Sequence, residues 1–233
     1  MPRRIVAFIV LAVVLAAVFV RLGFWQLSRL SQRRAQNAVI ARHLAEAETP
    51  WDKLGPPDSA RLRRTVVLGV PDTAQEFAIL GRSRNGSPGV WIITPVRVAG
   101  DTAAVLVNRG WVYSPDASTV DLSRWRERRT EFRGYTQPLL AGPANVKARG
   151  LRSFDSGGVD SLLPYPFAPV YLVLQDSGAI DSTPARLPLP VLNDGPHLSY
   201  AIQWFCFAAI AVGGAAIVGK RARDSELAAR HSP

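Results

Sequence analysis

A histidine, a tyrosine and a tryptophan open a long uncharged segment near the C-terminal end of the chain, in the stretch HLSYAIQWF. Residues three and four apart share one face of a helix, so His197, Tyr200 and Trp204 would lie together. A helix N-terminus disfavours a cationic imidazole, and neutral imidazole is the form that binds a metal. Alanines on the same face would leave room for a flat hydrophobic ligand. The residues alone leave a second interpretation open, in which His197 is a hydrogen-bonded anchor.

A second stretch, LGFWQLSRLSQRR, combines an aromatic residue with several cations. Trp25, Arg29 and Arg33 follow one another at intervals of four and therefore share one helical face. This face is a candidate binding surface. The alternative is an interfacial tryptophan beside solvated cations.

Arg109 is a third candidate, because it interrupts the apolar run VLVNRGWV together with Asn108. An Asn-Arg-Gly sequence can end a strand in a purely structural turn. The Arg109 side chain can equally direct a two-pronged donor at a carboxylate. The residues favour neither interpretation over the other.

Histidine and cysteine are too scarce for the common catalytic centres. The 233-residue chain has three histidines and one cysteine, and it contains no Gly-x-Ser-x-Gly, His-Glu-x-x-His or P-loop sequence. Outside the basic tail, which holds His231, the histidines are His43 and His197, which are too few for a three-histidine zinc site. Cys206 has no partner for a disulfide, and a Cys-x-x-Cys-His site for covalent haem attachment is missing. A membrane-anchored enzyme is therefore disfavoured.

Two apolar segments predict the elements that position these residues. Residues 5–20 are apolar throughout, and residues 198–219 carry no charge. A membrane-spanning helix needs about 20 largely apolar residues, so we expect spans at 5–25 and 198–219. A cleaved signal peptide over 1–22 is the alternative, but bulky residues stand where small ones should precede a cleavage site. We expect the spans to pack through small residues, which are Ala12, Ala16 and Gly23 on the first and Ala209 and Gly213 on the second.

The basic cluster at 220–223 sets the expected topology. Lysine and arginine are retained on the cytoplasmic side of a membrane, which places the tail 220–233 in the cytoplasm. Two spans then place residues 1–4 there as well and leave 26–197 as an extracytoplasmic domain. The arginines that follow the first span run against this rule and need another explanation.

Strand-like runs dominate the segment between the spans. Residues 26–48 continue at helical spacing, and a Pro- and Gly-rich stretch then ends the helix. Strands are expected over 64–70, 76–82, 89–98, 104–113, 130–138 and 169–177, with part of 114–129 helical and 141–168 irregular. Short connections such as Asn85-Gly86 favour antiparallel pairing. The expected class is an α+β membrane protein, with two transmembrane helices flanking an extracytoplasmic domain that has an antiparallel β-sheet and a few short helices.

The chain has a formal net charge of +10. The central segment carries a mild positive excess from scattered residues, and the rest of the charge lies at the two short ends. Such a distribution argues against nucleic acid as a partner. Anionic lipid or the carboxylates of a ligand suit it better.

The stretches described above together resemble the surfeit locus protein one family, whose members are assembly factors for haem–copper cytochrome oxidase. The resemblance covers nearly the whole chain. It rests on LGFWQLSRLSQR, GRSRNGSPGVWIITPV, VLVNRGWV, LPYPFAPVYLVLQ and HLSYAIQWF.

The resemblance implies a non-enzymatic factor of the bacterial cytoplasmic membrane that binds haem A transiently and helps deliver it to subunit I of the oxidase. It implies His197 as the ligand of the haem iron. Met1 and His231 fall on the predicted cytoplasmic side and Cys206 lies two turns below His197, so His43 is the one other candidate ligand, and we expect the sixth position to be open or weakly filled. The resemblance implies His197, Trp204, Trp25 and Arg29 as cofactor-binding residues, and Tyr200, Arg33 and Arg109 complete the expected set from the patterns described above. Implied partners are subunit I, the lipid bilayer and, as a second candidate protein, haem A synthase. The alternative is a structural chaperone that stabilises subunit I and carries no haem.

Overall fold

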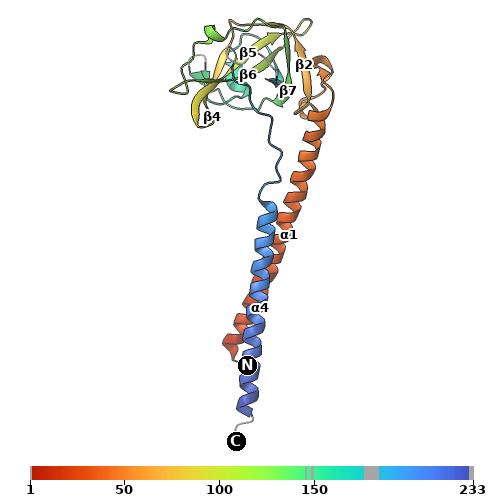
Figure 1. Ribbon diagram of the computed structural model, residues 1–233, viewed down its shortest axis with the longest axis vertical. Helices are drawn as coiled ribbons and strands as arrows, with labels where there is room; N and C mark the ends of the chain where they lie inside the picture. The colour runs from red at the N-terminus through yellow and green to blue at the C-terminus, as the bar shows by residue number, and fades with distance from the viewer. Residues whose placement is uncertain (1, 145, 148–149, 176–183, 231–233) are drawn as a thin grey trace. The chain divides into compact units, whose positions relative to one another are not determined.

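The computed structural model describes residues 2–144, 146–147, 150–175 and 184–230 (Figure 1). The chain divides into two compact units. A helical unit combines Met1–Val39 with Val191–Pro233, and a sheet unit is formed by Ile40–Pro190. The predicted limits of the spans and of the extracytoplasmic domain stay predictions. The boundary of the helical unit at residue 39 lies within the first helix, which continues past its apolar run as expected for residues 26–48.

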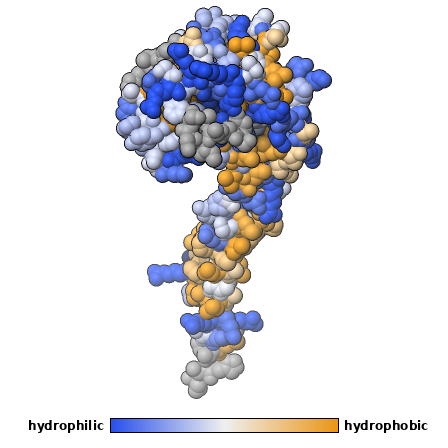
Figure 2. All heavy atoms as spheres, turned by 45° about the horizontal axis from the view of Figure 1, so that its top comes forward, coloured by the Kyte–Doolittle hydropathy of each residue, from blue (hydrophilic) through white to orange (hydrophobic). Residues whose placement is uncertain are grey.

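Two long helices build the helical unit. Helix α1 spans Arg3–Ala45 and helix α4 spans His197–Arg230. Within their apolar windows only 11% and 17% of the residues are buried, so these helices are not the covered core helices of a soluble protein. Length and composition make both able to cross a membrane. In Figure 2, hydrophobic side chains predominate along them.

The two helices run antiparallel and meet along a seam of small residues (Figure 1). Its buried members are Ala12, Ala16, Gly23 and Leu30 on α1, and Ala201, Ala208, Ala215 and Ala222 on α4. The interval of seven on α4 is the period of a left-handed coiled coil, in which the helices stay in contact along a 3.5-residue repeat. The prediction that Ala12, Ala16 and Gly23 pack between the helices is confirmed. The corresponding prediction for α4 is wrong, because Ala209 and Gly213 lie one and five residues past the seam position Ala208 and are exposed.

Aromatic residues fill the spaces that this seam leaves. A Cβ added to Gly23 would stand 2.6 Å from the Phe205 ring, so the ring packs directly on the backbone of α1. One turn further toward the N-terminus of α1, Phe19 stacks on Trp204 with 5.7 Å between the ring centroids. Small residues and rings thus alternate along the interface.

The sheet unit contains ten strands in one mixed sheet, as far as the described residues show. Its order is β1-β2-β7-β10-β6-β5-β4-β9-β8, and β3 pairs with β5 at the side. The strands are β1 Thr49–Pro50, β2 Arg64–Leu68, β3 Val70–Pro71, β4 Phe77–Arg84, β5 Ser87–Arg97, β6 Ala104–Tyr113, β7 Glu131–Pro138, β8 Val146–Lys147, β9 Gly150–Leu151 and β10 Phe167–Leu174. The short helices are η1 Trp51–Lys53, α2 Pro57–Ala60, η2 Leu122–Trp125 and α3 Ser156–Asp160.

The six predicted strands are confirmed within a few residues, but the prediction of an antiparallel sheet is wrong in part. Strand β10 pairs antiparallel with β7 and parallel with β6, so it inserts between two strands that precede it in the chain. The pairs β1–β2 and β4–β9 are parallel as well. The long stretch from the end of β6 to the start of β10, which includes β7, is what allows β6 and β10 to run parallel, whereas short turns allow only antiparallel neighbours.

The predicted hairpin turn at Asn85-Gly86 is confirmed. Asn85 and Gly86 have φ of 51° and 80° and join β4 to β5, as a type I′ hairpin turn requires. Asp121 caps η2 by accepting a hydrogen bond from the backbone N–H of Ser123. The core then forms from alternate residues of these strands, with Phe77, Ile79 and Leu106 fully buried among its members.

Candidate functional site

Helix α4 begins at His197, and the residues before it turn the chain into the helix. Gly195 has a φ of 68°, in the left-handed region that favours glycine. The carbonyl of Pro196 accepts from the backbone N–H of Tyr200 at 3.1 Å and from the Ser199 hydroxyl at 2.8 Å. The imidazole therefore stands in the first turn of a well-formed helix.

The His197 ring is held by a glutamine of the other helix. Nδ1 of His197 lies 2.9 Å from Oε1 of Gln26. An amide oxygen only accepts hydrogen bonds, so in this arrangement Nδ1 carries the hydrogen. In a neutral ring Nε2 then has the lone pair and is the nitrogen that can bind a metal. Sequence reasoning did not single out Gln26, although it interrupts the small and apolar seam residues of α1.

The chain entering α4 is tied to α1 just above this pair. The carbonyl of Asn193 accepts from Asn37 Nδ2 at 2.9 Å and from Arg33 Nε at 3.3 Å. Arg34 Nε donates to Asp194 Oδ2 at 2.8 Å. These groups are exposed, so each contact contributes little to stability. Their effect is to fix where the chain reverses.

A pocket of about 300 Å³ adjoins the His197 ring. It is lined by Arg29, Gln32, Arg33, Gln36, Gly195 and His197. A Cβ added to Gly195 would stand 3.6 Å from His197 Nε2, so the edge with the free lone pair faces this glycine. Arg29 donates to Gln32 Oε1 at 3.1 Å within the same wall. The pocket thus combines an imidazole with two cations, which suits a metal complex that carries carboxylates.

The structure brings together three of the predicted site residues, His197, Arg29 and Arg33. Trp25 and Tyr200 are 54% and 46% exposed and do not line this pocket. Trp204 lies in the helix seam, stacked on Phe19 and 5.9 Å from Phe207. The cofactor-binding role of these three aromatic residues stays a prediction.

Arg109 lies in the sheet unit and is engaged by carboxylates of this chain. It is 3% exposed, donates to Glu76 at 2.9 Å and forms an ion pair with Glu127 at 3.3 Å. Burial lowers the pKa of the Arg109 guanidinium, and the charges of both glutamates oppose this effect. Burial alone would raise the pKa of Glu127, but hydrogen bonds from Arg129 and the charge of Arg109 bring it down to about 2. Nothing in the sequence linked these acids to Arg109.

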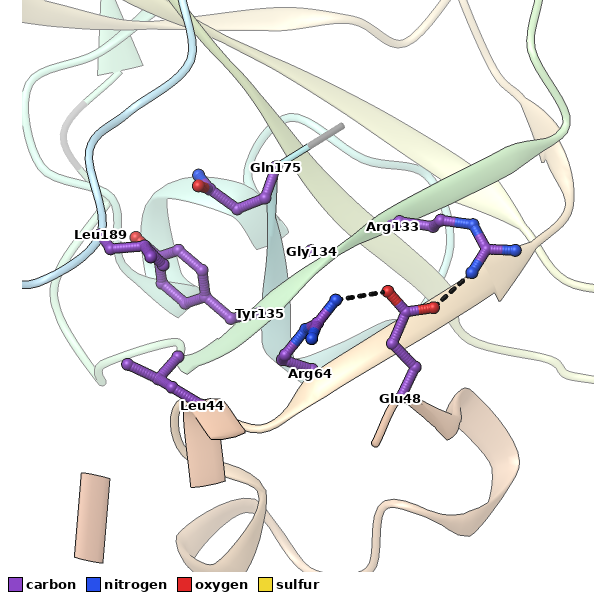
Figure 3. Close-up of a pocket in the computed structure, with 8 residues that line it drawn as sticks. All are labelled: Leu44, Glu48, Arg64, Arg133, Gly134, Tyr135, Gln175 and Leu189. Carbon is purple, nitrogen blue, oxygen red and sulfur yellow. Dashed lines mark hydrogen bonds and ion pairs between the residues drawn. The ribbon is translucent and has the colours of Figure 1, made fainter. Parts of the chain in front are cut away.

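A second pocket, of about 270 Å³, lies in the sheet unit (Figure 3). Glu48 there accepts from Arg64 at 3.1 Å and also from Arg133, and Arg133 bonds Glu131 as well. Burial raises the pKa of the neighbouring Tyr135 to about 12. The arginines of this pocket are paired with glutamates of the same chain. We therefore interpret it as a structural contact between the end of α1 and strands β2 and β7.

Comparison with known proteins identifies one family. A model described as the SURF1 family matches residues 13–209. A SURF1-like protein of Rickettsia felis is 26% identical over 204 residues, which cover 82% of this chain and 87% of the relative. An uncharacterised SURF1-like protein of Mycobacterium bovis is 30% identical, with 92% of this chain and 84% of the relative covered.

Proposed function

Since this chain belongs to the SURF1 family, a family of cytochrome oxidase assembly factors, we propose that it binds haem A and helps deliver it to subunit I of a haem–copper oxidase. The protein acts as a carrier and performs no chemistry of its own. Haem A synthase is a second candidate partner, as the protein from which the haem would be received.

The observation that carries this proposal is the pairing of His197 with Gln26 beside a cationic pocket. His197 Nε2 would hold the iron, and Arg29 and Arg33 would hold the propionates. Two charged guanidinium groups match two carboxylates, and bidentate pairs of this kind are strong and directional. The exposed faces of Trp25 and Tyr200 are available to the apolar macrocycle. Haem A supplies the redox-active iron that the oxidase needs.

The surroundings of the site suit a carrier that releases its cargo. The pocket is lined mainly by exposed polar side chains, and His197 is its one His, Cys, Asp or Glu; no group of three or more such residues that could hold a metal ion occurs among the described residues. His43 belongs to the sheet unit, where its Nδ1 lies 3.0 Å from the Arg61 carbonyl oxygen. We therefore take His197 as the one strong protein ligand, with the sixth position of the iron open or weakly filled.

Membrane placement follows from the same two helices. The basic residues at 220–223 favour a cytoplasmic C-terminus, and two spans would then place the N-terminus there too. His197 then lies at the extracytoplasmic end of α4, in a bacterial cytoplasmic membrane. Arg29, Arg33 and Arg34 break the positive-inside pattern because they serve the ligand and the chain reversal.

Absorption spectra of the purified full chain test the proposal. We expect a haem spectrum from the wild type, its loss or strong perturbation in His197→Ala, and nearly no change in His43→Ala. Normal binding by His197→Ala would exclude the ligand role. A wild type that supports oxidase assembly and takes up no haem would establish the structural chaperone instead. A change from low-spin to high-spin iron in His43→Ala would show a bis-histidine site.

A further inference from the structure

We propose that Gln26 is a positioning residue that selects the tautomer of His197 and so makes Nε2 the iron-binding nitrogen. This inference rests on the proposed function and deepens it, because it names the group that prepares the ligand. The observation is the 2.9 Å contact between Gln26 Oε1 and His197 Nδ1.

Gln26 occupies a seam position that its neighbours fill with glycine and leucine. It follows Gly23 by three residues and precedes Leu30 by four, which continues the heptad spacing of the α1 interface. A polar side chain at such a position costs stability unless it is hydrogen-bonded. On α4, His197 precedes the buried Ala201 by four residues and so stands at the matching position. The two polar residues form one layer at the outer end of an otherwise apolar seam.

Contacts on both sides of this layer hold its register. Below it, the Phe205 ring packs on Gly23, where any side chain would collide with it. Above it, Leu30 is buried in the seam with 5% of its surface exposed. Asn37 Nδ2 also donates a hydrogen bond of 2.9 Å to the carbonyl oxygen of Asn193. A slip of one helix along the other would therefore break packing as well as the hydrogen bond. A single polar pair in an apolar seam is a known way to specify register.

The orientation of the amide decides what the pair does. With Oε1 toward the ring, Nδ1 carries the hydrogen and Nε2 is free to bind iron. With the amide turned over, its NH₂ group would donate to Nδ1, and Nε2 would carry the hydrogen and be blocked. The first orientation is the one in the structure and the one that iron binding through Nε2 requires. Partners that hold the second nitrogen of a metal-binding histidine also raise its basicity.

Nuclear magnetic resonance of the haem-free full chain in detergent measures the tautomer directly. The histidine rings are labelled with ¹⁵N and assigned with His197→Ala, and spectra are recorded at alkaline pH, where imidazole is neutral. We expect the His197 hydrogen on Nδ1 in the wild type and in Gln26→Glu, whose carboxylate also accepts. We expect it mainly on Nε2 in Gln26→Leu. Gln203→Leu makes the same chemical change at an exposed position of α4 and should resemble the wild type.

Titration with ferric haem B provides the second measurement. Loss of a second-shell partner typically lowers metal affinity about 10- to 100-fold, and we expect a loss of that size in Gln26→Leu. Gln26→Glu should retain binding, with the reduction potential of the haem shifted to a lower value because the carboxylate makes the imidazole more electron-rich. Gln203→Leu should bind as the wild type does.

The two measurements separate this inference from the proposed function. A wild-type hydrogen on Nε2, or a tautomer that is the same in Gln26→Leu, would overturn the role of Gln26 whatever binds there. Equal haem affinity of the wild type and Gln26→Leu would overturn it too. An Nδ1 hydrogen that depends on Gln26, in a protein that takes up no haem, would uphold the positioning and reject the haem-carrier function. If Gln26→Leu does not fold, the wild type and Gln26→Glu still decide the tautomer.

Discussion

Replacing Arg109 with leucine would remove the cation that two buried carboxylates share. Arg109 is 4% exposed in its side chain, Glu76 1% and Glu127 8%. Leucine fills part of the volume of the arginine stem but leaves Glu76 and Glu127 without their common partner. The variant therefore separates a structural Arg109 from one that binds a ligand.

The magnitude follows from the loss of one partner of a buried ion pair, which typically costs about 3–5 kcal/mol. Against the effect of burial, the pKa of Glu127 is lowered from 4.5 to about 2 chiefly by hydrogen bonds from Arg129, and the charge of Arg109 adds to them, so only part of this shift depends on Arg109. Arg129, which bonds Glu127 at 2.7 Å, is unchanged in the variant and should keep the loss toward the lower end of this range.

The pH dependence has a definite sign. A carboxyl whose folded-state pKa is depressed stabilises the fold above its unfolded pKa and loses this contribution as the pH falls. The window here runs from about 4.5 down to about 2. Burial raises the pKa of Glu76, so without Arg109 its charge becomes still more costly near neutral pH. The difference between wild type and Arg109→Leu should shrink on acidification.

Urea unfolding of the full chain in detergent, followed by tryptophan fluorescence at several pH values, measures this difference. Arg128→Leu is the matched control, because the Arg128 side chain is exposed and such changes usually stay within about 0.5 kcal/mol. A free energy of unfolding for Arg109→Leu that equals the control, together with lost haem binding, would refute the structural reasoning and return Arg109 to the ligand site.

Three other outcomes are expected. Arg29→Ala should lower haem retention more than the exposed change Arg152→Ala, and equal absorption spectra of the two loaded variants would reduce Arg29 to a solvated surface cation. Reporter fusions after residue 60 should be extracytoplasmic and fusions after residue 225 cytoplasmic, and an extracytoplasmic tail would refute the topology. Gly23→Leu should overpack the seam against Phe205 and destabilise the helix pair by about 1–3 kcal/mol in thermal unfolding, whereas unchanged unfolding would mean that the ring moves freely.

Patterns along the chain were enough to locate most elements. Apolar runs and their flanking charges predicted both long helices, and alternation with turn residues such as Asn85-Gly86 predicted six strands. These features are local, because a helix or a hairpin satisfies its backbone hydrogen bonds among residues that are close in sequence. For the same reason His197 could be placed at the start of its helix from the uncharged segment that follows it.

Pairings between distant residues were decided only by the tertiary structure. Strand β10 lies beside β6 because a long connection returns the chain there, and Arg109 meets Glu76 and Glu127 because the sheet brings them into one interior. The partner of His197 is 171 positions away, on a helix of opposite direction. Which residues of two helices face each other depends on the register of their seam, and a shift of one position exchanges buried Ala208 for exposed Ala209. The histidine was therefore visible in the sequence, while the glutamine that prepares it became visible only when the helices were packed.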